Sequence, residues 1–196
     1  MSEEPALVAG PAVIAAAVTR LAEAISADHP DGVVVVGVLK GGAVLVADLV
    51  RALSVPCRVD FLALSPYGAG GARVRILKDL DGDVDGCDVV LVEGVVDTGL
   101  SAGYLLRLLE ERGARSVALC ALLDRPARRI VPVAPAYVGF EAPASYLVGY
   151  GLDLRERYRN LPGIHALPGL DAPSSRSPAL PASPPERRFD TAFYGG

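Results

Sequence analysis

Hydrophobic positions along this chain follow two patterns. Residues 11–25 are rich in alanine and apolar at helical spacing, which predicts an amphipathic helix. Residues 33–38, 89–92 and 116–123 are apolar without alternation, as is typical of strands buried on both faces of a parallel sheet. The chain is therefore expected to combine helices with a buried sheet.

Further helices and strands are predicted between these runs. A helix is expected over residues 43–53, and another from the DTG motif to about residue 112, with Gly113 ending it. Residues 57–64 and 73–80 predict a strand and its return, on either side of a glycine-rich, mobile loop at 65–72. Strands alternating with helices predict an α/β fold, whose ligands bind beyond the carboxyl ends of the parallel strands.

Composition favours one soluble domain. The 196 residues are 51% hydrophobic and 21% charged, with a formal net charge of -4, so neither a nucleic-acid surface nor an anionic membrane is an expected partner. No apolar run is long enough to span a bilayer, and Cys57, Cys87 and Cys120 lack paired metal spacing, so a cytoplasmic protein with buried thiols is expected. Six prolines lie between residues 168 and 185, so we expect a domain at 1–170 and a disordered tail at 171–196.

The segment EGVVDTGLS, residues 93–101, carries the clearest chemistry. The acid Glu93 follows the buried strand, and Asp97 precedes a small, hydroxyl-bearing turn that opens a helix. Small residues let the backbone approach an anion, and the free N–H groups of a helix start donate to it. This segment therefore predicts a phosphate site, and Lys40 in LKGG, at the end of another strand, adds a cation to the same edge.

Four motifs, in order and spacing, resemble the hypoxanthine-guanine phosphoribosyltransferase family across residues 5–165. They are LKGG at 39–42, EGVVDTGLS at 93–101, LLDRPARR at 122–129, and YVGFEAPASYLVGYGLDLRERYRNLP at 137–162. The resemblance implies a type I phosphoribosyltransferase fold, with a mostly parallel sheet flanked by helices and a small hood. It also implies purine salvage: ribose 5-phosphate passes from phosphoribosyl pyrophosphate (PRPP) to N9 of hypoxanthine or guanine, and pyrophosphate (PPi) is released. Mg²⁺ and a homo-oligomer, a dimer or tetramer, are implied as well.

The resemblance also assigns roles to individual residues. Asp97 would handle a proton near purine N7, and Glu93 would contact the ribose hydroxyls and a metal ion. Asp153 would lie near the purine 2-position and a second magnesium, and a cis peptide would precede Lys40. The other implied contacts are pyrophosphate binding by Leu39, Lys40, Gly41 and Arg159; 5′-phosphate binding by Asp97, Thr98, Gly99, Leu100 and Ser101; purine binding by Arg125, Tyr146 and Leu147; and a closing loop with Ser65 and Tyr67.

Three positions depart from the family pattern. Gly94 replaces the second of two adjacent acids, Pro66 interrupts a Ser-Tyr pair, and Arg125 replaces a lysine. Losing one charge-assisted hydrogen bond costs on the order of 1.5–3 kcal/mol, so Gly94 is expected to weaken catalysis.

Two alternatives to a working purine enzyme remain. One is a nucleotide- or PRPP-sensing protein with a degenerate site, whose C-terminal Phe189, Phe193 and Tyr194 dock on a partner. The other transfers phosphoribose to a non-purine acceptor.

Overall fold

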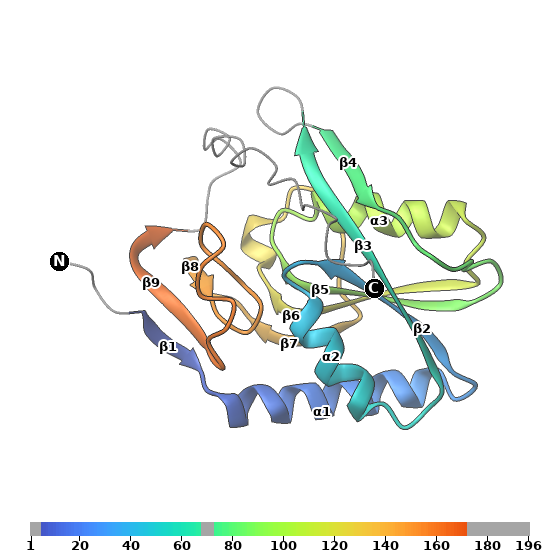
Figure 1. Ribbon diagram of the computed structural model, residues 1–196, viewed down its shortest axis with the longest axis horizontal. Helices are drawn as coiled ribbons and strands as arrows, with labels where there is room; N and C mark the ends of the chain where they lie inside the picture. Colours follow the sequence, from blue (N-terminus) through green and yellow to red (C-terminus); the bar gives the residue numbers. More distant parts are fainter. Residues whose placement is uncertain (1–4, 68–72, 172–196) are drawn as a thin grey trace, which may run out of the picture.

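A central six-stranded sheet forms the centre of the molecule and positions the loops at its edges. The computed structural model describes residues 5–67 and 73–171. Six strands lie in the order β4-β3-β2-β5-β6-β7, and all neighbours are parallel except the antiparallel pair β3 and β4 (Figure 1). Their bounds are β2 Val33–Leu39, β3 Cys57–Tyr67, β4 Arg73–Lys78, β5 Asp88–Val96, β6 Ser116–Asp124 and β7 Tyr137–Glu141. The mostly parallel sheet expected from the sequence is confirmed.

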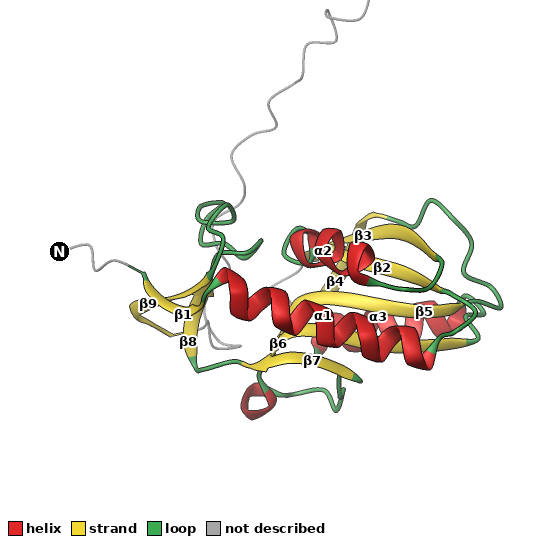
Figure 2. Ribbon diagram, turned by 90° about the horizontal axis from the view of Figure 1, so that it is seen from below, coloured by secondary structure: helices red, strands yellow, loops and turns green. Residues whose placement is uncertain are grey.

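Helices cover both faces of this sheet (Figure 2). Helices α1 (Pro11–Asp28) and α2 (Ala43–Ala52) share one apolar core with Val33 and Val35 of β2. Helix α3 (Leu100–Glu111) packs in the other core with Val34 and Val36. Because alternate residues of a strand face opposite sides, the unbroken apolar run of β2 supplies both cores at once.

A small second sheet forms the hood. Strand β1 (Ala6–Ala9) pairs with β9 (Ile164–Asp171), which pairs with β8 (Ser145–Val148), and both pairings are antiparallel. The hood lies to one side of the central sheet, at the left of Figure 1. It brings the segment between β8 and β9 toward the ends of the parallel strands, where the site residues were expected.

Strand β3 is longer than expected. It continues to Tyr67, so Ser65, Pro66 and Tyr67 pair with β4 instead of forming the predicted loop. The proline is tolerated because β2 has already ended, its last partner on β3 being Ala63. The predicted glycine-rich loop is therefore wrong at its first three residues, which belong to β3.

The rest of that loop, residues 68–72, lies outside the described residues, as does the tail from 172 with Phe189, Phe193 and Tyr194. Among the described helices, none is long and apolar enough to cross a membrane.

Candidate active site

One cavity gathers residues from the sheet and from the hood. Its volume is about 330 Å³, and it lies where the carboxyl ends of β2, β5 and β6 approach the segment between β8 and β9. The lining includes eight of the residues predicted from the sequence: Lys40, Gly41, Asp97, Arg125, Tyr146, Leu147, Asp153 and Arg159. It also includes Val95 and Leu152, which the sequence did not single out. Residues 119 positions apart in the chain, from Lys40 to Arg159, therefore meet at one site.

The turn before α3 forms a second, smaller hollow of about 110 Å³. It is lined by Glu93, Val95, Val96, Asp97, Thr98, Gly99, Ser101 and Ala102. Gly99 adopts a φ of 81°, and a Cβ added to it would lie 2.8 Å from the carbonyl oxygen of Val131. Glycine is therefore required at this turn, which presents the start of α3 to the hollow. Such a helix start binds anions through its free N–H groups.

Asp97 is held from the segment after β6. Its Oδ1 lies 2.7 Å from Nε of Arg128, and its backbone carbonyl accepts a 2.8 Å hydrogen bond from Arg129. Arg128 belongs to a short 3₁₀ turn, Pro126–Arg128, that follows β6 directly. Neither arginine was selected from the sequence, although the basic end of LLDRPARR was the available signal. The pairing orients the Asp97 carboxylate at the mouth of the phosphate hollow.

The environment of Glu93, on β5, is unusual for an acid. Its Oε1 is out of contact with solvent, and no described residue forms a hydrogen bond with this atom. Burial raises the pKa of the Glu93 carboxyl to about 8. The acid therefore lies in the wall of the phosphate hollow with one buried oxygen that has no hydrogen-bond partner among the described residues.

Gly94, the missing second acid, is packed tightly. A Cβ on Gly94 would lie 2.8 Å from the carbonyl oxygen of Gly41 and 3.0 Å from Cδ2 of Leu152. A Cβ on Gly151 would also lie 2.8 Å from the Gly41 oxygen. Three backbone segments thus meet with room for no side chain at either glycine: the loop after β2, the end of β5 and the hood segment.

The cations of the site are paired with acids of the hood segment. The peptide bond between Leu39 and Lys40 is cis, as the resemblance implied, and Nζ of Lys40 donates to Oε1 of Glu156 at 3.0 Å. Arg159 lies 2.8 Å from Oδ1 of Asp153 and 3.3 Å from Oε2 of Glu156. Hydrogen bonds from Lys40 and, to a smaller extent, from Arg159 hold the pKa of Glu156 below its usual value.

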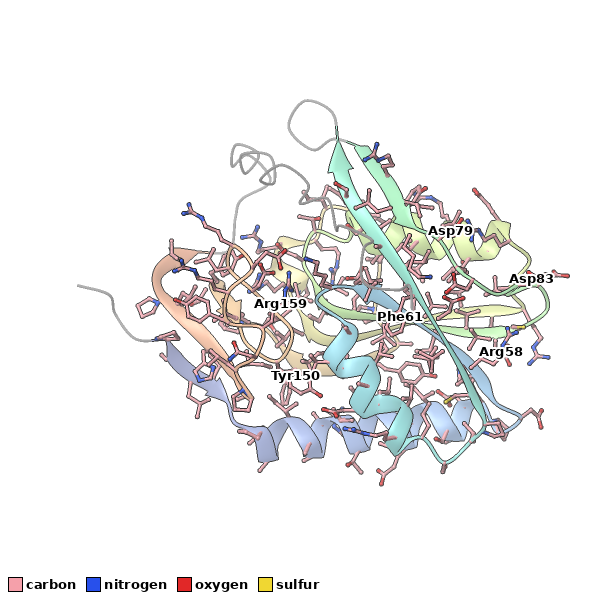
Figure 3. All side chains as sticks on the ribbon, in the orientation of Figure 1. Arg58, Phe61, Asp79, Asp83, Tyr150 and Arg159 are labelled. Carbon is pink, nitrogen blue, oxygen red and sulfur yellow. The ribbon has the colours of Figure 1, made fainter. Side chains whose placement is uncertain are left out.

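The hood segment is anchored on the central domain. Tyr150 and Arg159 both lie between β8 and β9 (Figure 3). The Tyr150 hydroxyl donates to Asp48 of α2 at 2.6 Å, and Arg159 donates to the carbonyl of Gly151 at 2.7 Å. The first bond ties the segment to α2, which follows the loop that contains Lys40, and the second closes the segment on itself.

At the other end of the cavity, two predicted purine contacts also brace the hood. Arg125 is 6% exposed, and it donates from Nε to the carbonyl of Pro143 at 2.9 Å and from Nη2 to that of Ser145 at 2.8 Å. Its burial lowers the pKa of the guanidinium. The Tyr146 hydroxyl donates to the carbonyl of Asp153 at 3.0 Å. Arg125 therefore holds two carbonyl groups of the hood at once. A lysine would do this less well, because it lacks the planar guanidinium group.

Comparison with known proteins agrees with this geometry. The family model described as "Phosphoribosyl transferase domain" matches residues 6–155. A hypoxanthine-guanine phosphoribosyltransferase of Mycobacterium avium is 46% identical over 145 residues, which cover 72% of this chain and 71% of the relative. The chain belongs to the hypoxanthine-guanine phosphoribosyltransferase family.

Other members of the family match over nearly their whole length. The hypoxanthine phosphoribosyltransferase of Salmonella typhimurium is 41% identical over 166 residues, covering 82% of this chain and 93% of the relative. The crystal structure of a hypoxanthine-guanine phosphoribosyltransferase from Bacillus anthracis superposes with a TM-score of 0.79 at 36% identity, covering 84% of this chain and 99% of that one. The type I phosphoribosyltransferase fold expected from the sequence motifs is thereby confirmed.

The acids of the site offer a magnesium ion few ligands of their own. Glu93 has an unpartnered oxygen, whereas Asp153 already accepts from Arg159 and from the backbone N–H of Glu156. Within residues 5–67 and 73–171, no three His, Cys, Asp or Glu side chains converge as a preformed metal cage. Magnesium often keeps several waters and binds through one or two carboxylates together with substrate phosphates, and these residues fit that kind of site.

Proposed function

We propose that this protein is a purine salvage phosphoribosyltransferase that transfers ribose 5-phosphate from PRPP to a 6-oxopurine, hypoxanthine or guanine. The observation that carries the proposal is a pair of adjoining cavities that share Val95 and Asp97. The smaller one contains an anion-binding helix start, and the larger one is lined by three cationic side chains and the aromatic ring of Tyr146. The family resemblance and the relatives' activities support the same reaction.

The 5′-phosphate would bind at the turn before α3. Thr98, Gly99 and Ser101 line the hollow, so the free N–H groups of the helix start and the hydroxyls of Thr98 and Ser101 would donate to the phosphate. Glu93, in the same wall, would accept hydrogen bonds from the ribose hydroxyls. A sugar phosphate bound at these groups would extend toward the larger cavity, which shares Val95 and Asp97 with the hollow.

The pyrophosphate would bind between the loop after β2 and the hood segment. Lys40 and Arg159 supply the positive charge, and the backbone from Leu39 to Gly41 lies beside them. In the reaction the bond from C1 to the pyrophosphate oxygen breaks, a bond from C1 to purine N9 forms, and PPi leaves. Glu93 and Asp153 would hold a magnesium ion, which would supply positive charge to the leaving pyrophosphate.

The purine would bind between Tyr146 and the end of β6. Tyr146 offers its ring for stacking, Leu147 offers backbone groups, and Arg125 retains donors beyond the two that brace the hood. Asp97 lies at the junction of both cavities and would accept the proton that the base loses, or stabilise it at N7. As in the family, a homo-oligomer is proposed.

The test is base-dependent PPi release from the purified full chain with PRPP and Mg²⁺. Hypoxanthine, guanine and xanthine are offered separately, with Asp97→Ala as the inactive variant and Asp31→Ala as a control at the opposite end of the sheet. Release that depends on base and falls by about 100-fold or more in Asp97→Ala supports the proposal. PRPP binding without release for any of the three bases would overturn it and favour a sensing protein or another acceptor.

A further inference from the structure

One acid, Glu156, lies between the two cations proposed to bind pyrophosphate. Its Oε1 accepts from Nζ of Lys40 at 3.0 Å, and its Oε2 lies 3.3 Å from Nε and Nη2 of Arg159. The two oxygens of one carboxylate are thus divided between a lysine and an arginine from distant segments. Phosphate oxygens make the same kind of contacts with such a pair.

The backbone holds Glu156 in this position. Its N–H donates to Oδ2 of Asp153 at 2.7 Å, and the flanking residues Leu154 and Arg157 exchange two backbone hydrogen bonds. Arg155 and Glu156 have φ values of 52° and 63°, which reverse the chain within this turn. The carboxylate is therefore presented to the cations by a closed turn, and not by a freely extended segment.

The four charged groups of these ion pairs cancel one another. Lys40 and Arg159 contribute two positive charges, and Asp153 and Glu156 contribute two negative ones. An incoming diphosphate therefore meets a cation pair that is already neutralised. Removing one acid leaves an excess positive charge and strengthens the attraction for a polyanion.

The ion pair between Lys40 and Glu156 can be replaced by contacts with a ligand. The side chains of Lys40 and Glu156 are 65% and 64% exposed, so water solvates both as soon as they part. Ion pairs of this exposure are weak compared with the several contacts that a diphosphate would make. A diphosphate can displace Glu156, but it must do so at every binding event.

We propose that Glu156 is a built-in competitor of the diphosphate that sets the affinity of this site for PRPP and PPi. This inference rests on the function proposed above, because it assumes that Lys40 and Arg159 bind the pyrophosphate group. In the free protein Glu156 keeps the two cations paired and apart from stray anions. On product release it returns to them and opposes the rebinding of PPi.

The test compares Glu156→Gln with the wild-type protein in calorimetric titrations of PRPP and of PPi, each with Mg²⁺ and without base. We expect the variant to bind both ligands about 2- to 10-fold more tightly, the range of one or two exposed ion pairs that need no longer be broken. PPi should inhibit the variant more strongly by a similar factor, while the KM for the base stays unchanged.

Two further variants separate charge from other effects. Glu156→Asp keeps the carboxylate and should retain wild-type affinity to within about 2-fold. Glu110→Gln makes the same change in net charge at an exposed position of α3 and should leave both affinities unchanged. In about 1 M salt, where the Debye length falls to about 3 Å, the advantage of Glu156→Gln should shrink.

Unchanged or weaker binding by Glu156→Gln would overturn the inference, since weaker binding would mean that Glu156 positions the cations. Failure of the proposed function looks different: the wild-type protein itself would bind PRPP but release no PPi with any purine, or bind no PRPP at all.

Discussion

A side chain at position 94 has no room, because its Cβ would lie 2.8 Å from the carbonyl oxygen of Gly41. That oxygen belongs to the loop proposed to hold pyrophosphate. The glycine that replaces a family acid is therefore part of the contact that places this loop against β5. The same glycine thus removes a negative charge from the site and lets the loop after β2 pack closely against β5.

Restoring the acid should accordingly harm the protein. Gly94→Asp is expected to lower the free energy of unfolding by about 1–3 kcal/mol, as overpacking does, and to raise the KM for PRPP by displacing the Gly41 carbonyl. Urea unfolding and PRPP titration of the rate measure the two effects. Gly94→Ala should behave similarly without the charge.

Gly82→Ala is the matched control, because a Cβ on Gly82 would meet only Asp60, at 3.8 Å. It should leave both quantities nearly unchanged. If Gly94→Asp had a higher rate than the wild type, position 94 would accommodate an acid, and packing would not be the reason for its glycine.

The position of Arg125 leads to a similar prediction. Arg125→Lys restores the family residue, yet one amine cannot reproduce the two bonds from Nε and Nη2 to the carbonyls of Pro143 and Ser145. A buried acceptor left without a partner costs about 1–3 kcal/mol, so the variant should be destabilised by about that amount. The KM for the base should rise, because the same carbonyls hold the start of β8 and with it Tyr146.

Thermal or urea unfolding and base titrations at saturating PRPP measure this variant. Arg107→Lys, at an exposed position of α3, is the control for the loss of a guanidinium. If Arg125→Lys kept wild-type stability and bound base more tightly, bracing of the hood by Arg125 would not be its main role.

Much of this site followed from local sequence patterns. The unbroken apolar runs predicted the parallel strands, and the carboxyl ends of such strands converge, which brought Lys40, Asp97 and Arg125 together. Tyr146, Asp153 and Arg159 required the family resemblance, because their segment has no regular periodicity. The cis peptide before Lys40 was likewise available only from the resemblance.

Other features depend on contacts that no local pattern encodes. The crowding of Gly94 arises from Gly41 and Leu152, which are 53 and 58 positions away in the chain. The pairing of Glu156 with Lys40 joins residues 116 positions apart. The end of β3 was missed because pairing with β4, not the propensity of Ser65 or Pro66, decides where the strand stops.

Asp88 should make stability depend on pH at the opposite end of the sheet. Its carboxylate accepts from Arg115 Nε at 2.9 Å and from the Ser116 hydroxyl at 2.7 Å, and these bonds hold its pKa well below the ordinary value of 3.8. The folded state therefore binds this proton less readily than the unfolded state. The stabilisation is complete above the unfolded pKa and is lost as the pH falls toward the folded one.

Asp88→Asn should lower the free energy of unfolding at pH 7 by about 1 kcal/mol, a modest value because the Arg115 side chain is 62% exposed. Urea unfolding between pH 7 and pH 3 should show the two proteins converging as the pH falls below about 4. A difference that stays constant over this range would mean that Asp88 contributes through packing and not through its charge.

Tyr146 combines a ring and a hydroxyl whose contributions separate on substitution. Tyr146→Phe keeps the ring and removes the bond to the Asp153 carbonyl, so it should cost about 0.5–1.5 kcal/mol of stability with little change in the KM for the base. Tyr146→Leu removes the ring as well. Stacking of a base on an aromatic ring is worth about 1–3 kcal/mol, so the KM for the base should rise about 5- to 150-fold.

Base titrations of the rate at saturating PRPP, together with urea unfolding, measure both variants. The KM for PRPP should stay the same in each, because Lys40 and the turn before α3 are untouched. If Tyr146→Phe and Tyr146→Leu raised the KM for the base equally, the hydroxyl that holds Asp153 would matter more than the ring. The purine would then be selected by the position of the hood segment, with stacking contributing little.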